Sequence, residues 1–506
     1  MKKRWISMIL AGVLAVGCLV GCGSGEDKKK GTSASDIEIS YQHVGLGKEW
    51  LDALVEEFNK KYPEYNVYYN ATASSAAATA AYGMEDVDTV DLYMVPKQYD
   101  VTYLEPLNDV LETTIEGESK SLKEKFNPSY LALEELDGNY YNLTQGGGIV
   151  GFVYNKNIFK DNNITQLPRT TGELALVCTT LLDANVTPLC HFFKGGYGYY
   201  GYLSNVWYAQ YEGVDYFRDL YNDPSLDKML RQDGRYEVLK VYEKIITPAN
   251  TLNGSNSTEH VSMQTKFLEG QCAMMLTGSW LSSEMENSDK LQDFEMMKTP
   301  VISSIIDKLT TVKSEAELRR LISAIDNVTD GIEKEDVYKK GDAYLVEGKT
   351  VSAQDWSYVR AARNTMSATY SGSSCFIPKY SNAKEGAKEF LKFMYSDEGY
   401  KIYTESAHLC LPLKLSEGEI DISTWNAFEK NQAQLFATTE NIVTDYMMGK
   451  HRLYIDGGAD PFASYQFINR MSSQNESERV TAEQVWDGIQ SIIKDRYDSE
   501  WMLNIK

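Results

Sequence analysis

Strand-like and helix-like segments alternate near the start of the chain, and this alternation is the feature that most restricts the fold. Residues 36–40 alternate polar and apolar side chains, as a half-buried strand does. Apolar side chains then recur at helical spacing over 51–62, and Pro63 ends this predicted helix. Residues 67–69 and 89–95 are strand-like again. Strands separated by helices predict a largely parallel α/β sheet.

The length of the chain predicts more than one domain. The chain has 506 residues, which is too many for one ordinary core and indicates about two to three domains. Farther along, Thr170 with Glu173 and Ser314 with Glu317 predict capping boxes at two helix starts. Apolar residues over 485–493 predict a final helix. No repeat of fixed period is present, which argues against a solenoid or propeller.

The N-terminus has the pattern of a bacterial export signal. Residues 2–4 are basic, and residues 6–20 are apolar or small without a charge. That run is too short for a comfortable membrane span and has the size of a signal-peptide core. It ends in Leu-Val-Gly-Cys at 19–22, which resembles the bacterial lipobox. The resemblance implies that residues 1–21 are a signal peptide and that the sulfur of Cys22 carries a lipid.

The residues after Cys22 form a tether in this interpretation. Residues 22–35 are rich in Gly, Ser, Asp and Lys, and they contain too few apolar side chains to build a core. The protein is therefore expected on the extracytoplasmic face of the cell membrane, held by its lipid alone. The alternative is an ordinary signal peptide or a short anchor helix, with cysteines that occur there by chance.

The charge of the chain excludes some partners. The formal net charge is −22, and removal of residues 1–21 takes three positive charges and leaves −25. An anionic protein of this kind is a poor match for nucleic acid or anionic lipid. Five cysteines follow Cys22, without CxxC spacing, so a disulfide framework is not indicated, although one pair is possible.

Five segments, in order, resemble a family of extracellular solute-binding proteins that serve bacterial ABC transporters, specifically its sugar-binding branch. The segments are 50–67 (WLDALVEEFNKKYPEYNV), 137–159 (DGNYYNL followed by GFVYNKNIF), 167–174 (LPRTTGEL), 267–280 (FLEGQCAMMLTGSW) and 387–412 (beginning AKEFLKFMY). The resemblance extends over most of 36–497 but fails from about 301 to 370. There the chain is charged, with a helical pattern over about 301–356 that indicates an insertion.

The resemblance implies a two-lobed α/β fold, like that of periplasmic binding proteins, with a ligand cleft between the lobes. The expected bounds are 36–145 plus 375–415 for lobe 1, and 150–370 plus 416–506 for lobe 2. The chain would cross between lobes near 144–151 and 371–374, where small residues tolerate the dihedral changes of a hinge. The implied partners are a carbohydrate and the transmembrane subunits of an ABC permease, and a monomer is expected.

A sugar offers C–H faces and a rim of hydroxyl groups, so its site needs aromatic faces and polar side chains. Trp280 matches the Gly-x-Trp of the family, in which the indole stacks on sugar. The loop at 195–202 places Tyr197 and Tyr199 between glycines, and Trp207 follows closely. Such a loop can present rings to a ligand. The alternative for each ring is a place in the core.

Polar candidates come from the ends of predicted strands. Gln42 and His43 follow the first strand, where the family places ligand contacts and where an open α/β sheet forms its crevice. Gln145 lies at the expected hinge. Asp91 opens the third strand and is either a ligand contact or a structural acid. Tyr465 lies where the family often supplies another ring.

Catalytic and cofactor motifs are not convincing in this sequence. Residues 146–151 satisfy GxGxxG, but they lead into a strand-like segment instead of the helix that a dinucleotide site needs. The five histidines are scattered without metal-ligand spacing, so we expect no metal, no cofactor and no enzymatic activity. A surface glycoside hydrolase remains an alternative, because 72 acidic residues supply many carboxylate pairs. A binding protein for a peptide or another non-sugar solute is a second alternative.

Overall fold

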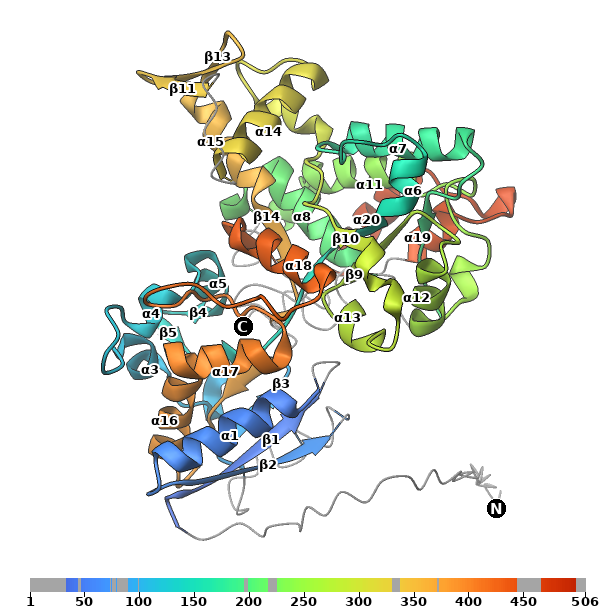
Figure 1. Cartoon of the computed structure of the whole chain (residues 1–506). Coiled ribbons are helices and arrows are strands. Elements are labelled where there is room, and N and C mark those ends of the chain that lie inside the picture. The colour runs from blue at the N-terminus through green and yellow to red at the C-terminus, as the bar shows by residue number, and fades with distance from the viewer. Residues whose placement is uncertain are drawn as a thin grey trace, which may run out of the picture.

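Two separate β-sheets organise the protein, and each forms the centre of one lobe (Figure 1). The computed structural model describes residues 33–43, 47–72, 74, 79, 90–98, 100–194, 199–216, 225–329, 337–370, 373–443 and 466–496. None of the helices within these ranges combines the length and the apolar composition that crossing a membrane requires.

The sheet of lobe 1 has five strands in the order β2-β1-β3-β15-β6. The strands are β1 (Asp36–Gln42), β2 (Asn66–Thr72), β3 (Leu92–Val95), β6 (Leu143–Thr144) and β15 (Ser374–Phe376). β1 is parallel to both β2 and β3, as the strand–helix alternation predicts, whereas β15 is antiparallel to β3 and β6. The parallel part of the sheet therefore comes from the N-terminal segment, and its edge comes from later returns of the chain.

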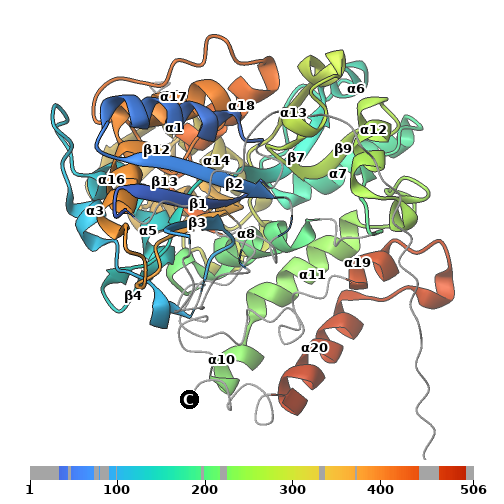
Figure 2. The same cartoon turned by 90° about the horizontal axis from the view of Figure 1, so that it is seen from below.

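Helices cover the sheet of lobe 1. They are α1 (Glu49–Lys61), α3 (Asn108–Glu112), α4 (Leu122–Lys125), α5 (Pro128–Glu134), α16 (Lys384–Tyr395) and α17 (Asp397–Ala407), with a small hairpin of β4 (Glu135–Leu136) and β5 (Asn139–Tyr140). α1 and α17 run side by side (Figure 2). The ring of Trp50 in α1 lies 5.2 Å from that of Tyr403 in α17, and both are fully buried. The helical spacing over 51–62 thus produces the core face of α1.

The sheet of lobe 2 has six strands. β16 (Asn441–Val443), β14 (Thr365–Ala368), β7 (Ile149–Asn155), β9 (Met274–Gly278) and β8 (Leu189–Cys190) are neighbours in this order, and β10 (Phe294–Met296) pairs with β7. β7 is buried at all seven positions, which explains why its sequence is continuously apolar instead of alternating. This central strand follows directly from the GxGxxG segment, so that motif leads into a strand.

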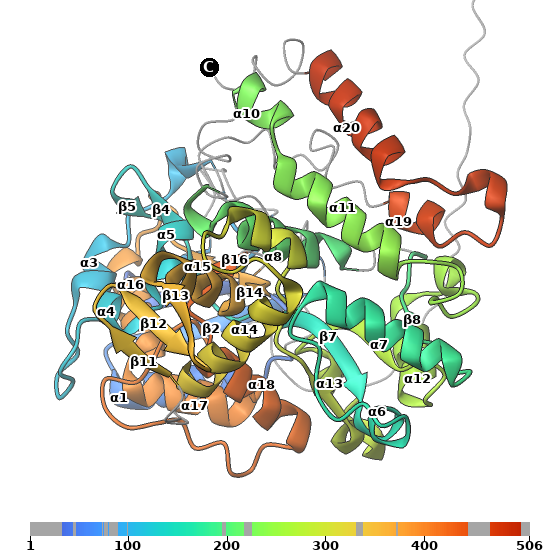
Figure 3. The same ribbon diagram turned by 90° about the horizontal axis from the view of Figure 1, so that it is seen from above.

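Ten helices of the described residues surround this second sheet. They are α6 (Lys156–Asp161), α7 (Thr171–Asp183), α8 (Tyr200–Glu212), α10 (Leu226–Leu230), α11 (Asp233–Ile245), α12 (His260–Leu268), α13 (Leu281–Glu284), α18 (Ala427–Ala437), α19 (Gln466–Met471) and α20 (Ala482–Arg496). α20 lies beside α11 on the outside of the lobe (Figure 3). The final helix predicted from residues 485–493 is therefore confirmed.

The cysteines of the described residues are free thiols that form no disulfide with one another: Cys178, Cys190, Cys272, Cys375 and Cys410.

Both predicted helix starts are confirmed, with one difference in their hydrogen bonds. The Oγ1 atom of Thr170 accepts from the backbone N–H of Glu173, at 3.1 Å. The carboxylate of Glu173, however, accepts from the backbone N–H of Arg169, one residue before the cap. Only half of the expected capping box forms there. Ser314 and Glu317 behave in the same way at the start of α14 (Glu315–Thr329).

The segment predicted as a charged helical insertion is mixed in structure. α14 is followed, after residues that lie outside the described ranges, by a three-stranded antiparallel sheet and by α15 (Ala353–Arg363). The strands are β11 (Val337–Lys340), β12 (Ala343–Val346) and β13 (Lys349–Ser352). Figure 1 shows this sheet projecting from lobe 2 at the end far from lobe 1. A turn at Gly341, with a positive φ of 61°, joins β11 to β12 in a region where the sequence predicts a helical pattern.

Within the described residues, three segments of the chain connect the two lobes. The first joins β6 to β7, the second joins β14 to β15, and the third joins α17 to α18. The first two lie side by side, because the backbone N–H of Gln145 donates to the carbonyl oxygen of Ser373 at 2.9 Å. Gly148 and Thr369 are joined in the same way, with the N–H of Thr369 3.0 Å from the carbonyl oxygen of Gly148. These paired segments contain the residues where the sequence predicts a hinge between the lobes.

Gly148→Ala is expected to destabilise the protein at this hinge. A methyl group on Gly148 would lie 2.6 Å from the Cβ atom of Ser279, so the crossing strand and β9 would have to separate. We expect the free energy of unfolding in urea to fall by about 1–3 kcal/mol, the usual cost of overpacking. Gly488→Ala in α20 is the control, because nothing lies within 4 Å of the added methyl group. Equal unfolding midpoints for the two variants would contradict the prediction.

Candidate ligand-binding cleft

A cavity of about 770 Å³ opens between the two lobes. Lobe 1 contributes His43 after β1, the start of α1, and residues 406–409 at the end of α17. Lobe 2 contributes ten residues between Ser279 and Gln292, from the end of β9 through α13, together with Asn426, Glu429 and Gln432 at and in α18. A cavity of this size, between lobes and with mixed polar and apolar walls, is typical of a site for a small molecule.

Trp280 lies at the wall of this cavity, directly after β9. Its indole ring folds back over Gly278, where a Cβ atom would lie only 2.3 Å from two ring atoms. The ring of Tyr199 meets the indole edge-on, with 5.0 Å between centroids and 70° between planes. The indole is therefore held in one orientation by a glycine beneath it and an aromatic ring beside it, and it remains partly exposed to the cavity.

Tyr199 belongs to a small polar network behind the indole. Its hydroxyl lies 3.3 Å from Nε2 of His260, and the amide of Gln264 donates to that nitrogen at 2.9 Å. The same amide donates to Glu284 at 2.7 Å. Burial lowers the pKa of His260 to about 4, so this imidazole is neutral near pH 7 and accepts through Nε2. Burial also raises the pKa of Glu284, and the hydrogen bond from Gln264 offsets part of this effect.

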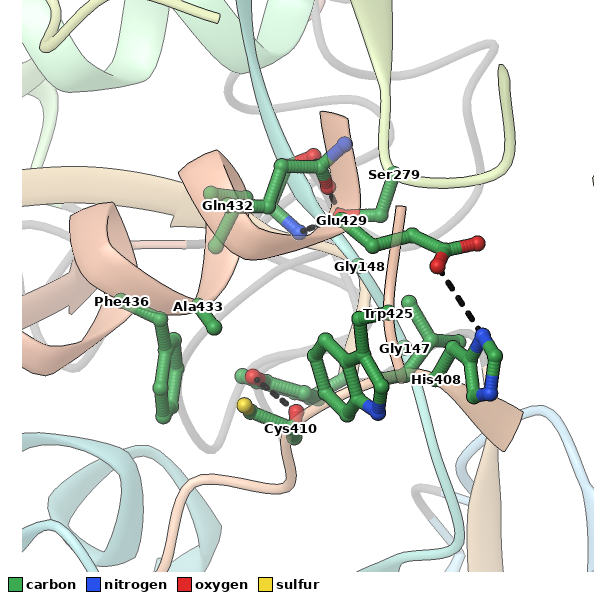
Figure 4. A pocket seen from close by; sticks show the side chains of 13 residues that line it. Gly147, Gly148, Ser279, His408, Cys410, Trp425, Glu429, Gln432, Ala433 and Phe436 are labelled. Carbon is green, nitrogen blue, oxygen red and sulfur yellow. Dashed lines mark hydrogen bonds and ion pairs between the residues drawn. The ribbon is translucent and has the colours of Figure 1, made fainter. Parts of the chain in front are cut away.

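His408 and Glu429 both line the cavity, and they join the third crossing segment to lobe 2 (Figure 4). His408 ends α17 with a positive φ of 51°, and its Nδ1 lies 2.9 Å from the carboxylate of Glu429 in α18. Its ring stacks on the indole of Trp425, with 5.5 Å between centroids. Glu429 also accepts from Ser282 of α13, at 2.6 Å. One carboxylate thus ties together the third crossing segment and two helices of lobe 2.

Two buried amides near the hinge have no hydrogen-bond partner among the described residues. The side chain of Gln145 is fully buried between the lobes, and that of Gln432 is only 6% exposed at the wall of the cavity. The indole N–H groups of Trp280 and Trp425 lack a partner in the same part of the structure. Buried polar groups normally form hydrogen bonds, so these atoms are available to bond with water or with a ligand.

The structure brings some of the predicted site residues together. His43 and Trp280 line the same cavity from opposite lobes, and Tyr199 packs against Trp280. Gln145 lies at the hinge, as expected from its position between the two sheets. Gln42 is at the end of β1, as predicted, but its side chain is mostly buried.

Two predicted residues lie inside a lobe instead of facing the cleft. Trp207 is fully buried in α8, and its indole N–H donates to the carbonyl oxygen of Pro300 at 2.9 Å. Asp91 is fully buried in lobe 1, where it accepts from the backbone N–H of Glu38 and from Ser381. Asp91 therefore holds β1 to the start of α16, as the structural alternative proposed. Tyr197, Tyr465 and Cys22 lie outside the described residues.

Sequence reasoning missed the residues around His408. No motif that indicates a ligand includes Trp425, Glu429 or Gln432, and the histidines are scattered along the sequence. One readable signal was present, because Asn426 and Glu429 have the spacing of a capping box, which the structure forms in full. That signal predicts a helix start, and it does not indicate that Glu429 faces another lobe.

The comparisons with known proteins agree with this geometry. Residues 45–306, just over half of the chain, match the family described as bacterial extracellular solute-binding proteins. The chain belongs to this family. A similar solute-binding protein is an ABC transporter extracellular-binding protein from Pyrococcus horikoshii, 21% identical over 60% of this chain and 71% of the relative. A maltotriose-binding protein from Pyrococcus abyssi is 28% identical, over 35% of this chain and 34% of its own length.

Solved structures show the same two-lobed α/β fold. The bacterial solute receptor AcbH, whose reported preference is for β-D-galactopyranose, superposes with a TM-score of 0.63 at 14% identity, over 92% of this chain and 99% of its own. A manno-oligosaccharide-specific solute-binding protein from Bifidobacterium animalis gives a TM-score of 0.55 at 17% identity, over 94% of this chain and 98% of its own. Identities this low establish the fold of this solute-binding protein and leave its ligand to be argued from the cleft.

Gly278→Ala is expected to displace the Trp280 indole from its place in the cleft. The added methyl group would lie about 2.3 Å from the ring, well inside van der Waals contact, so the indole must move. In protein labelled with 5-fluorotryptophan, we expect the ¹⁹F resonance of Trp280, assigned with Trp280→Phe, to shift or broaden. Gly488→Ala is again the control and should leave this resonance unchanged. An unshifted Trp280 resonance in Gly278→Ala would show that the glycine does not position the ring.

Proposed function

We propose that this protein captures a mono- or oligosaccharide between its two lobes and delivers it to the membrane permease of an ABC importer. The observation that carries the proposal is the position of Trp280 at the wall of the inter-lobe cavity, with its ring orientation fixed by Gly278 and Tyr199. A rigid aromatic surface suits the C–H face of a sugar ring, because few side-chain torsions are lost on binding. The unpaired amide of Gln432 and the carboxylates beside it suit the hydroxyl rim.

The proposed mechanism is closure of the lobes around the sugar. The two hinge segments allow one lobe to rotate against the other, and a ligand that touches both walls binds the closed form more tightly than the open form. That difference in affinity supplies the free energy for closure. The permease would then recognise the closed protein. Several structural relatives carry names that include a sugar, among them mannotriose and maltose, and these names support a carbohydrate over other solutes.

The function proposed is binding without chemical change. The family consists of binding proteins, and this supports a transport receptor over a glycoside hydrolase. A screen of residues 32–506 against mono- and oligosaccharides tests this point, because a ligand of the native state raises the melting temperature. A sugar that binds and is recovered intact supports the proposal. A cleaved sugar would assign a hydrolase, and a response only to peptides would assign a peptide receptor.

Trp280→Ala should weaken the binding of any sugar found in that screen. Loss of one aromatic anchor costs about 1–3 kcal/mol, which corresponds to a dissociation constant roughly 5- to 150-fold higher in calorimetry. Tyr103→Ala is the matched control, because this ring is exposed on lobe 1 and does not line the cavity. An unchanged dissociation constant for Trp280→Ala would remove the indole from the site.

We propose in addition that a lipid on Cys22 holds the protein at the membrane beside its permease. Two acyl chains on one residue anchor a protein far better than one chain does. Cys22→Ser should therefore move the protein from washed membranes to the soluble fraction, as measured by immunoblotting. Cys18→Ser is the control, because that cysteine lies within the proposed signal peptide, and this variant should stay in the membrane fraction. Retention of Cys22→Ser in washed membranes would contradict the lipid anchor.

A further inference from the structure

The ionisable side chains that line the cavity are mostly acidic, so their charge is predominantly negative. Five carboxylates line it, those of Glu49, Glu284, Glu286, Asp289 and Glu429. Lys and Arg are absent from the part of this lining that the structure describes. Two histidines, His43 and His408, are the remaining ionisable groups of the same lining. The excess of acidic groups gives the cavity a negative potential, which low-dielectric walls concentrate.

Few of these carboxylates are neutralised by the described residues around them, although the positive charge of Lys48 lies near Glu49. Glu429 has a partner in His408, but His260 beside Glu284 is neutral near pH 7, because burial lowers its pKa to about 4. Hydrogen bonds from its own backbone N–H and from that of Lys48 lower the pKa of Glu49, so this group stays ionised. Glu286 and Asp289 are exposed to the cavity, and no ion pair is formed by either within the described ranges.

A second feature of the same cavity indicates a ligand independently of charge. Both polar atoms of the Gln432 amide are buried and lack a hydrogen-bond partner among the described residues, although this side chain is 94% removed from solvent. An amide can donate to one polar group and accept from another, so it matches a hydroxyl or an amine and provides no positive charge for an anion. The same cavity thus holds both an unused polar contact and carboxylates without an ion-pair partner among the described residues.

We propose that this cleft selects its sugar by charge: it admits uncharged and amine-bearing sugars and rejects sugars that carry a carboxylate, phosphate or sulfate group. The inference rests on the carbohydrate function proposed above. An anionic sugar would be desolvated against several carboxylates with no cation to pair with it, and like charges placed together disfavour binding strongly. A protonated amine would instead meet Glu286 and Asp289 without displacing an existing partner. The charge on the wall therefore acts as a repulsive element of specificity.

The experiment uses three matched series of sugars, with gluco, galacto and manno configurations. Each series contains the neutral sugar, its C6 uronate and its 2-amino derivative, and binding is measured by calorimetry at pH 7. In any series that binds, we expect the uronate to bind at least tenfold more weakly than the neutral sugar. The difference should narrow at high salt, because ions screen the exposed carboxylates. A uronate that binds as tightly as its neutral parent would overturn the inference and leave the carbohydrate function intact.

Two variants with the same change in net charge separate the cavity from the protein as a whole. The double variant Glu286→Gln with Asp289→Asn should narrow the ratio between uronate and neutral affinities at least threefold. The control, Glu243→Gln with Glu269→Gln, removes two exposed carboxylates of lobe 2 outside the cavity and should leave that ratio unchanged. Equal ratios in both double variants would contradict selection by the cavity wall. If neither these series nor the oligosaccharides of the melting-temperature screen bind, the carbohydrate function fails, and the charge inference fails with it.

Discussion

The paired backbone at the hinge is the constraint on which the cleft depends. Two chain segments that run in opposite directions between the sheets are joined by hydrogen bonds, from Gln145 to Ser373 and from Thr369 to Gly148. β7 leaves this pairing and becomes the central strand of lobe 2, while β6 and β15 remain at the edge of the sheet in lobe 1. The position of one lobe relative to the other is therefore set by backbone groups instead of by flexible side chains. Because both walls of the cavity start from this paired backbone, they stay aligned with each other when the lobes move.

The two walls contribute different physical properties to the cleft. Lobe 2 supplies a rigid aromatic surface, because Trp280 is confined between Gly278 and Tyr199. The acidic groups come from both lobes, and the unpaired amide of Gln432 comes from α18. The aromatic surface thus lies on the wall formed by lobe 2, whereas the acidic side chains lie on both walls of the cavity. This division allows the Trp280 ring to stay fixed while the charge of the cavity depends on residues that can vary without disturbing the core.

Local features of the sequence predicted much of the fold. The order of β1, α1 and β2, the starts of α7 and α14, and the final helix follow from periodicity and capping residues, which act over a few positions. Trp280 and His43 could be placed in the cleft because a resemblance supplied the long-range pairing. The contact between His408 and Glu429 could not be predicted, because it depends on where the third crossing ends. Trp207 could not be assigned to the core for a related reason: nothing local in the sequence shows that α8 is buried on all sides, from Tyr200 to Tyr211.

The third crossing segment, which begins at His408, has a mechanical consequence. Two parallel tethers alone leave a pair of bodies free to twist as well as to bend, whereas a third tether placed to one side removes the twist. His408 and Glu429 fasten this third tether close to the other two, beside Gly148 and Tyr370. Three connections so close together favour a bending rotation of the lobes over a twist. A small solute needs to restrain only that one rotation, so little of its binding free energy is lost to ordering the lobes.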